Sequence, residues 1–291
     1  MKKIFILIAA TTLLVSCKDV IQVDLKKGET LLVVDAFIND QNAPQTVRLT
    51  TTDAYFSNAH TPSVNGATVT MKDMTSSRVV TFTGDGNGNY IYTPQPTDSM
   101  TQIGHMYQLN ITYNGINYSS LSKLNRTTTI DTILFKRKKG GGEDTSATPK
   151  HYYPYLIARD APGATDYYWI KTYKNGQFYN RPSELNVVQD GGGVGTDGIW
   201  FIPPNAFFQL TGEGDAPERF DLVTIELYSI NSDTYDFFQQ LKTQMSNSQA
   251  GLFATAPENV HTNITNDSGY GMKAIGWFNI GASTRKSVYA Q

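Results

Sequence analysis

Cysteine is almost absent from this chain of 291 residues, which contains a single one, Cys17. One thiol cannot form an intramolecular disulfide, so the folded body must be stabilised by its packed core alone. Charged residues make up only 17 % of the chain, and no long basic block accompanies the net charge of −2, which argues against nucleic-acid binding. No apolar run approaches the roughly 18 residues of a transmembrane helix.

Signatures of catalysis are also missing. The four histidines, His60, His105, His151 and His261, show no metal-ligand spacing. There is no Gly-x-Ser-x-Gly nucleophile elbow, and scarce glutamate leaves no evident carboxylate pair for glycoside hydrolysis. The stretch 85–90, "DGNGNY", starts like a calcium loop but lacks the glycine and glutamate that an EF-hand needs, so it predicts a hairpin turn. We therefore predict a protein without enzymatic activity, metal or cofactor.

The position of the lone cysteine is informative. It follows the cationic Met1-Lys2-Lys3 and an uncharged run at 4–15 whose length of 12 residues suits a signal-peptide core. Leu14-Val15-Ser16-Cys17 matches a bacterial lipobox. We predict that residues 1–17 carry a lipoprotein signal and that Cys17 becomes the lipidated amino terminus, anchored to a membrane by several acyl chains. The alternative is an ordinary secretory signal with a chance cysteine.

The residues after Cys17 bear on the side of the membrane. Lys18 and Asp19 resemble the start of the signal that sends some Bacteroidota lipoproteins to the outer leaflet of the outer membrane. They predict an outer-membrane protein exposed at the cell surface. The alternative is a periplasm-facing lipoprotein in which both residues belong to a plain solvated tether, 18–29.

Short strand patterns broken by turns fill residues 30–126. Alternation with period two recurs, and Asn114-Gly115 is typical of a type I′ hairpin turn, because both positions tolerate positive φ. The pattern predicts an N-terminal Ig-like or transthyretin-like β-sandwich. We expect its strands at 30–38, 45–52, 66–73, 78–84, 88–94, 105–113 and 116–122.

Residues 127–291 predict a second β-rich domain with one packed helix at 232–247. The helix places Phe237, Phe238, Leu241 and Met245 on one apolar stripe, which favours packing on a sheet. Further strands are expected at 129–137, 153–159, 166–173, 198–203, 220–230 and 272–281.

Aromatic clusters in this second domain are the best candidates for binding a ligand or partner. In the strand 166–173, Tyr167 and Trp169 face one way and Tyr168 and Ile170 the other, so both faces are apolar. This favours a buried central strand, and the alternative is a ring platform for sugars or a partner protein. The candidate binding residues are Tyr167, Trp169, Trp200, Phe207 and Phe208.

Several stretches, taken in order, resemble one known family. "LLVVDAFINDQNAPQTVRLT" (31–50) resembles the opening of domain-of-unknown-function family 4249, a family of Bacteroidota lipoproteins. "VTIELYSINSDTYDFFQQL" (223–241) resembles its strand–helix unit, and "AIGWFNIG" (274–281) resembles part of its closing segment. Membership implies a β-rich surface or periplasmic lipoprotein, often encoded beside a TonB-dependent outer-membrane transporter. It implies no site residues.

Together these features predict a non-enzymatic accessory lipoprotein that captures a glycan or small nutrient for a TonB-dependent transporter. The alternative is a surface adhesion or glycan-binding structural module, and a hydrolase with an unrecognised site is the third hypothesis. Asp98-Ser99-Met100 and Asp131-Thr132-Ile133 also resemble the loose O-glycosylation signal of Bacteroidota.

Overall fold

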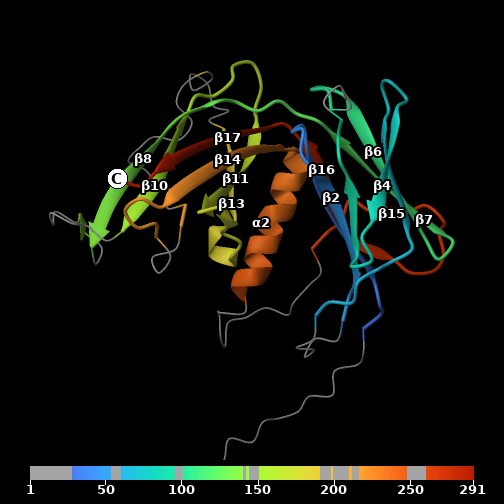
Figure 1. The fold of residues 1–291 in the computed structure, drawn as a ribbon. Helices are drawn as coiled ribbons and strands as arrows, with labels where there is room; N and C mark the ends of the chain where they lie inside the picture. Colours follow the sequence, from blue (N-terminus) through green and yellow to red (C-terminus); the bar gives the residue numbers. More distant parts are fainter. Residues whose placement is uncertain are drawn as a thin grey trace, which may run out of the picture.

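The computed structural model describes residues 28–53, 60–95, 101–139, 142–143, 151–190, 198, 210–211, 216–247 and 260–291. Several sequence predictions lie wholly or mostly outside these residues: the signal peptide, Cys17, Lys18 and Asp19, most of the tether, the strand expected at 198–203 except for Gly198, Asp98-Ser99-Met100, and the aromatic residues Trp200, Phe207 and Phe208. The described chain is mainly β, with sandwich-like sheets and one α-helix, as predicted (Figure 1).

The first sheet has nine strands in the order β15-β7-β6-β3-β4-β5-β2-β1-β16. Their bounds are β1 Leu32–Asn39, β2 Gln45–Thr51, β3 Thr68–Asp73, β4 Val79–Gly84, β5 Asn89–Tyr92, β6 Met106–Tyr113, β7 Ile116–Lys123, β15 Thr265–Asn266 and β16 Ala274–Gly281. All the strands expected between 30 and 126 are present. Asn114 and Gly115 join β6 to β7 with φ values of 50° and 75°, as a type I′ turn requires.

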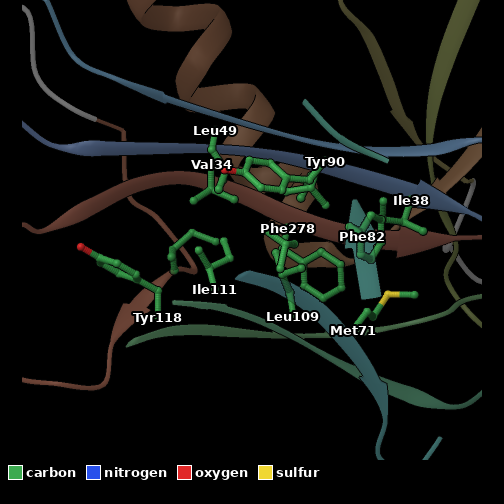
Figure 2. Packing of buried hydrophobic residues seen from close by; sticks show 14 of the residues in the cluster. Val34, Ile38, Leu49, Met71, Phe82, Tyr90, Leu109, Ile111, Tyr118 and Phe278 are labelled. Atoms are coloured by element: carbon green, nitrogen blue, oxygen red, sulfur yellow. The ribbon is translucent and has the colours of Figure 1, made fainter. Parts of the chain in front are cut away.

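This sheet folds over on itself around one core. Alternation along β1 buries Leu32, Val34, Ala36 and Ile38 and turns Val33, Asp35 and Phe37 to the opposite face. Figure 2 shows the side chains of the two halves meeting, among them Val34, Leu49 and Phe278 from one half and Leu109 and Ile111 from the other. The sequence pattern therefore sets the inner face, and it leaves Phe37 on the outside of the sandwich.

The second part of the fold has two smaller sheets packed face to face. A sheet with the order β10-β8-β9 packs on a sheet with the order β12-β11-β14-β17, in which β13 also pairs with β11. Tyr168 and Ile170 of β11 are fully buried between them, which confirms that β11 is a central strand. The bounds are β8 Ile130–Lys139, β9 Gly142–Glu143, β10 Tyr152–Ala158, β11 Tyr167–Lys174, β12 Gln177–Phe178, β13 Asn186–Gln189, β14 Leu222–Ile230 and β17 Ser283–Tyr289.

The helix α2 has the predicted bounds, Ser232–Asn247. It lies between the two parts of the fold in Figure 1 and packs on β11, β13 and the short 3₁₀ helix η2, Pro182–Glu184. In the part of the chain that the structure describes, no helix is both long and apolar enough to cross a membrane.

The C-terminal segment passes through both parts of the fold. The predicted domain boundary at residue 126 falls between β7 and β8, yet β15 and β16 are hydrogen-bonded into the first sheet. β16 runs parallel to β1, and Ala282 alone separates it from β17 of the second part. A Cβ on Gly281 would lie 1.9 Å from the backbone oxygen of Ser229, so only glycine lets β16 and β14 approach this closely. The two parts are therefore joined directly by neighbouring strands.

Candidate functional site

A groove lined by aromatic side chains lies where the two parts of the fold meet. Its volume is about 370 Å³, within the range of small-molecule sites. Its walls come from β1 and β16 of the first sheet, from β11, and from α2 and the segment 178–185. The principal apolar lining residues are Phe37, Trp169, Phe178, Phe238, Leu241 and Trp277.

Ring-to-ring contacts hold the walls together. The ring centroids of Phe37 and Trp169 are 5.3 Å apart with the planes at 71°, and Phe37 also stacks on Phe238 at 5.3 Å. Phe237 stacks on Trp277 at 4.6 Å with the planes at 18°. Edge-to-face and offset contacts of this kind add to the stabilisation from area burial. Aromatic rings from segments far apart in the sequence are thus held in one cluster.

Buried hydrogen bonds fix the back wall. Trp277 Nε1 donates to Thr234 Oγ1 at 2.8 Å, and that hydroxyl donates to Asn279 Oδ1 at 2.9 Å. Asn279 is fully buried, and its side-chain amide donates to Tyr228 Oη at 3.0 Å. Each polar group in this chain has a partner, so the network costs little in desolvation and holds the Trp277 ring in one orientation.

A cation lies against the aromatic cluster. Lys171 Nζ is 4.4 Å from the Trp169 ring centroid and 4.2 Å from that of Tyr228, which is the geometry of cation–π contacts. The same ammonium is 3.7 Å from Oε1 of the fully buried Glu226. Burial lowers the pKa of Lys171, and the Glu226 carboxylate opposes this effect.

The negative charge of the buried Glu226 carboxylate is balanced by neighbouring cations. Burial raises the pKa of its carboxyl group, but the charges of Lys171 and Arg285 outweigh burial and hold that pKa below its usual value. Arg285 Nη2 donates to Glu226 Oε2 at 2.6 Å, and Tyr173 Oη donates to the same oxygen at 3.0 Å. This ionic cluster therefore supports the strand that carries Trp169.

Exposed polar side chains lie at the rim of the groove, and one carboxylate, Glu184, lines it from a buried position. Asp35, Asn180 and Arg181 are exposed there, and the backbone N–H of Arg181 donates to Glu184 Oε2 at 3.0 Å. Among the described lining residues there is no histidine, serine or cysteine, and the titratable carboxyl groups are those of Asp35 and Glu184. The arrangement suits the binding of a small molecule with an apolar body and polar substituents at the rim.

The candidate binding residues predicted from the sequence lie in different places. Trp169 is half-buried and lines the groove, whereas Tyr167 packs beside it against Tyr235 at 5.3 Å between centroids. Trp200, Phe207 and Phe208 lie outside the described residues. Sequence reasoning missed Phe37 and Trp277. The available signal for Phe37 was an apolar residue on the outward face of an alternating strand.

Comparisons with known proteins identify the family to which the chain belongs. No curated protein matches the chain. A crystal structure of the FN1–FN3 domains of chicken CNTN1 matches with 13 % identity and a TM-score of 0.22, over 71 % of this chain and 62 % of that one. The chain thus spans less than two thirds of that structure. The sequence also matches the family described as Domain of unknown function (DUF4249) over residues 18–287, and the chain therefore belongs to the DUF4249 family.

Proposed function

We propose that this protein is a lipid-anchored accessory protein of the outer membrane. In this proposal it holds a small nutrient in the aromatic groove and delivers it to a TonB-dependent transporter. Cys17 is the lipid attachment point, and Lys18 and Asp19 direct the protein to the cell surface. No catalytic step is involved, and transfer requires only that the transporter site bind the nutrient more tightly than the groove does.

The aromatic groove carries this proposal. Its rings come from β1, β11, α2 and β16 and are held by contacts among themselves, so little ordering would accompany ligand binding. A concave, mainly apolar site with a few polar groups at its rim is the usual form of a small-molecule site. Its position between the first sheet and the sheet that contains β11 also lets occupancy affect how the two parts pack.

The ligand chemistry follows from the lining. Trp169 and Phe37 offer ring faces and edges that suit an apolar or aromatic body, or the less polar face of a sugar ring. The exposed Asp35 and Arg181 at the rim suit hydroxyl, amine or carboxylate substituents. We propose a small amphiphilic nutrient of this kind.

A groove-filling substitution with a matched control tests the proposal. Leu241 of α2 lines the groove, so Leu241→Trp places an indole in it, whereas Lys242→Trp adds the same ring at the exposed neighbouring position. A deletion strain is complemented with wild type, Leu241→Trp or Lys242→Trp at matched outer-membrane levels. Growth is then measured on a panel of single nutrients at limiting concentration.

We expect deletion to impair growth on at least one nutrient of the panel. Wild type and Lys242→Trp restore that growth, Leu241→Trp does not, and all three proteins co-purify with the transporter. Normal uptake of every nutrient in the deletion strain, with no transporter complex in purified outer membranes, would refute the proposal. Unimpaired uptake together with loss of binding to glycans or host matrix would favour adhesion instead.

A further inference from the structure

Three buried aspartates meet at one end of the second sandwich. Asp160 follows β10, Asp166 directly precedes β11, and Asp190 directly follows β13. Because β13 and β11 are antiparallel and Tyr167 pairs with Gln189, Asp166 and Asp190 become neighbours. The side chains are only 4 %, 8 % and 4 % exposed, in the same order.

Each carboxylate uses one oxygen to position the loops around it. The backbone N–H of Asp166 donates to Asp190 Oδ2 at 2.6 Å, and the N–H of Gly198 donates to Asp160 Oδ2 at 3.1 Å. Arg126 Nε donates to Asp166 Oδ2 at 2.9 Å. These bonds leave the second oxygens of Asp160 and Asp190 to be accounted for.

Those second oxygens have no conventional partner. Asp160 Oδ1 and Asp190 Oδ1 are buried and accept no hydrogen bond from any residue in the described part of the chain. A buried carboxylate oxygen without a hydrogen-bond partner is destabilising, because it has lost its contacts with water and gained none in return. These unpartnered oxygens are an observation separate from the clustering of acidic residues, and either a bound cation or a shared proton between the two side chains would satisfy them.

The distances between the carboxylate oxygens and the negative charge of the cluster both fit a bound cation. One carboxylate oxygen from each aspartate lies within 4.8 Å of the other two. Oxygens on opposite sides of a bound Ca²⁺ are about 4.6–5.2 Å apart, since each Ca–O bond is about 2.3–2.6 Å long. Arg126 contacts Asp166 from one side of the cluster and brings a single positive charge to a site that holds three carboxyl groups.

We propose that Asp160, Asp166 and Asp190 form a binding site for a divalent cation, with a preference for Ca²⁺. An all-oxygen set from carboxylates matches hard cations, and irregular loops suit the flexible coordination of Ca²⁺ better than the strict octahedron of Mg²⁺. The ion ties together the chain after β10, before β11 and after β13. It therefore stabilises this end of the second sandwich.

The rival arrangement is a proton shared between Asp160 and Asp190. Burial and the adjoining carboxylates of Asp160 and Asp166 raise the pKa of Asp190 to about 6 in the protein without a cation. A shared proton satisfies the same two oxygens without any metal, so the experiment must separate the two arrangements.

Isothermal titration with CaCl₂ and, separately, MgCl₂ tests the site. The full chain, purified in mild detergent and stripped with chelator, is titrated at pH 7.5, and Tm is measured in parallel. The variants are Asp160→Asn and Asp190→Asn, and the control is Asp236→Asn at an exposed position of α2. We expect saturable Ca²⁺ binding and a Tm rise of roughly 5 °C at saturation for wild type and control.

Each variant at the cluster should weaken Ca²⁺ binding at least about tenfold and remove the Tm rise, because it removes one ligand charge. The wild-type titration is decisive even if a variant folds poorly. Absence of binding to wild type at 10 mM CaCl₂, or a wild-type Tm that Ca²⁺ leaves unchanged while Asp190→Asn melts at a higher temperature than wild type, overturns the proposal in favour of the shared proton. An equal response to Mg²⁺ overturns the preference for Ca²⁺.

Discussion

Trp277 donates its indole N–H to the hydroxyl of Thr234 over 2.8 Å, which joins the last strand of the first sheet to the first turn of α2. Both side chains are almost fully buried, with exposures of 2 % and 1 %. The bond thus links the first sheet to the helix that closes the groove. It explains how a groove between two sheets keeps a defined shape.

Thr234→Val should destabilise the protein by about 1–3 kcal/mol, because it removes the acceptor of the indole N–H and the donor to Asn279 while it preserves shape. Urea denaturation followed by tryptophan fluorescence measures the change. The control is Thr243→Val on the exposed side of the same helix. Equal stability of the two variants would show that the buried network contributes nothing.

Gly276→Ala should prevent β16 from pairing closely with β1. Gly276 has a φ of 101°, and a Cβ there would lie 2.0 Å from the backbone oxygen of Val34. Both the positive φ and the overlap penalise any side chain, so we expect a loss of more than about 3 kcal/mol. Thermal melting of Gly276→Ala is compared with Gly28→Ala, where a Cβ meets nothing within 4 Å. A melting temperature within 1–2 °C of wild type would contradict this pairing.

Glu226→Gln should cost about 3–5 kcal/mol, because it leaves the buried Lys171 ammonium without its opposite charge. Arg285→Gln should cost much less, since the Arg285 side chain is 53 % exposed and Lys171 keeps its partner. Chemical denaturation of both variants in the same buffer gives the two values. The reverse order would mean that Arg285, and not Lys171, is the main partner of Glu226.

Protonation of the Asp73 carboxylate should make the free energy of unfolding depend on pH under acidic conditions. Burial raises the pKa of Asp73, but hydrogen bonds from Ser76, His105 and the Thr75 backbone outweigh it and lower that pKa to about 2, from an ordinary 3.8. The unfolded chain therefore takes up the proton first. The contribution of Asp73 is complete above about pH 4 and is lost as the pH falls towards 2.

Asp73→Asn removes this dependence. We expect it to be less stable than wild type at pH 7, with a difference that shrinks between about pH 4 and pH 2. Denaturation midpoints across that range measure the effect, with the exposed Asp233→Asn as control. A difference that stays constant down to pH 2 would exclude titration of Asp73 as its cause.

Local patterns were enough to place most of the regular structure. The helix 232–247 was predicted with its observed bounds because its apolar stripe, its acidic first turn and its flanking residues all lie within one short window. The strands from β1 to β7 follow from alternation and turn residues in the same way. The edge strand β17 was missed, because its Ser, Thr, Arg and Lys side chains give a weak apolar signal.

The candidate groove was only partly predictable. Trp169 was identified because its strand carries aromatic residues on both faces. Phe37 of β1 contacts Trp169 directly, and Trp277 of β16 joins the same groove by stacking on Phe237 of α2. No local pattern encodes these contacts between distant segments. The three aspartates likewise have no motif spacing, since the pairing of β13 with β11 brings them together.

The sequence by itself determined the β-rich class, the strand faces and the helix, because each depends on periodicity, and its short motif predicts lipid attachment at Cys17. Only the tertiary structure decided that β16 joins β1 across the length of the chain, that an aromatic groove forms between the two parts, and that Asp160, Asp166 and Asp190 converge. These features depend on long-range burial and strand pairing, which no local stretch of sequence specifies.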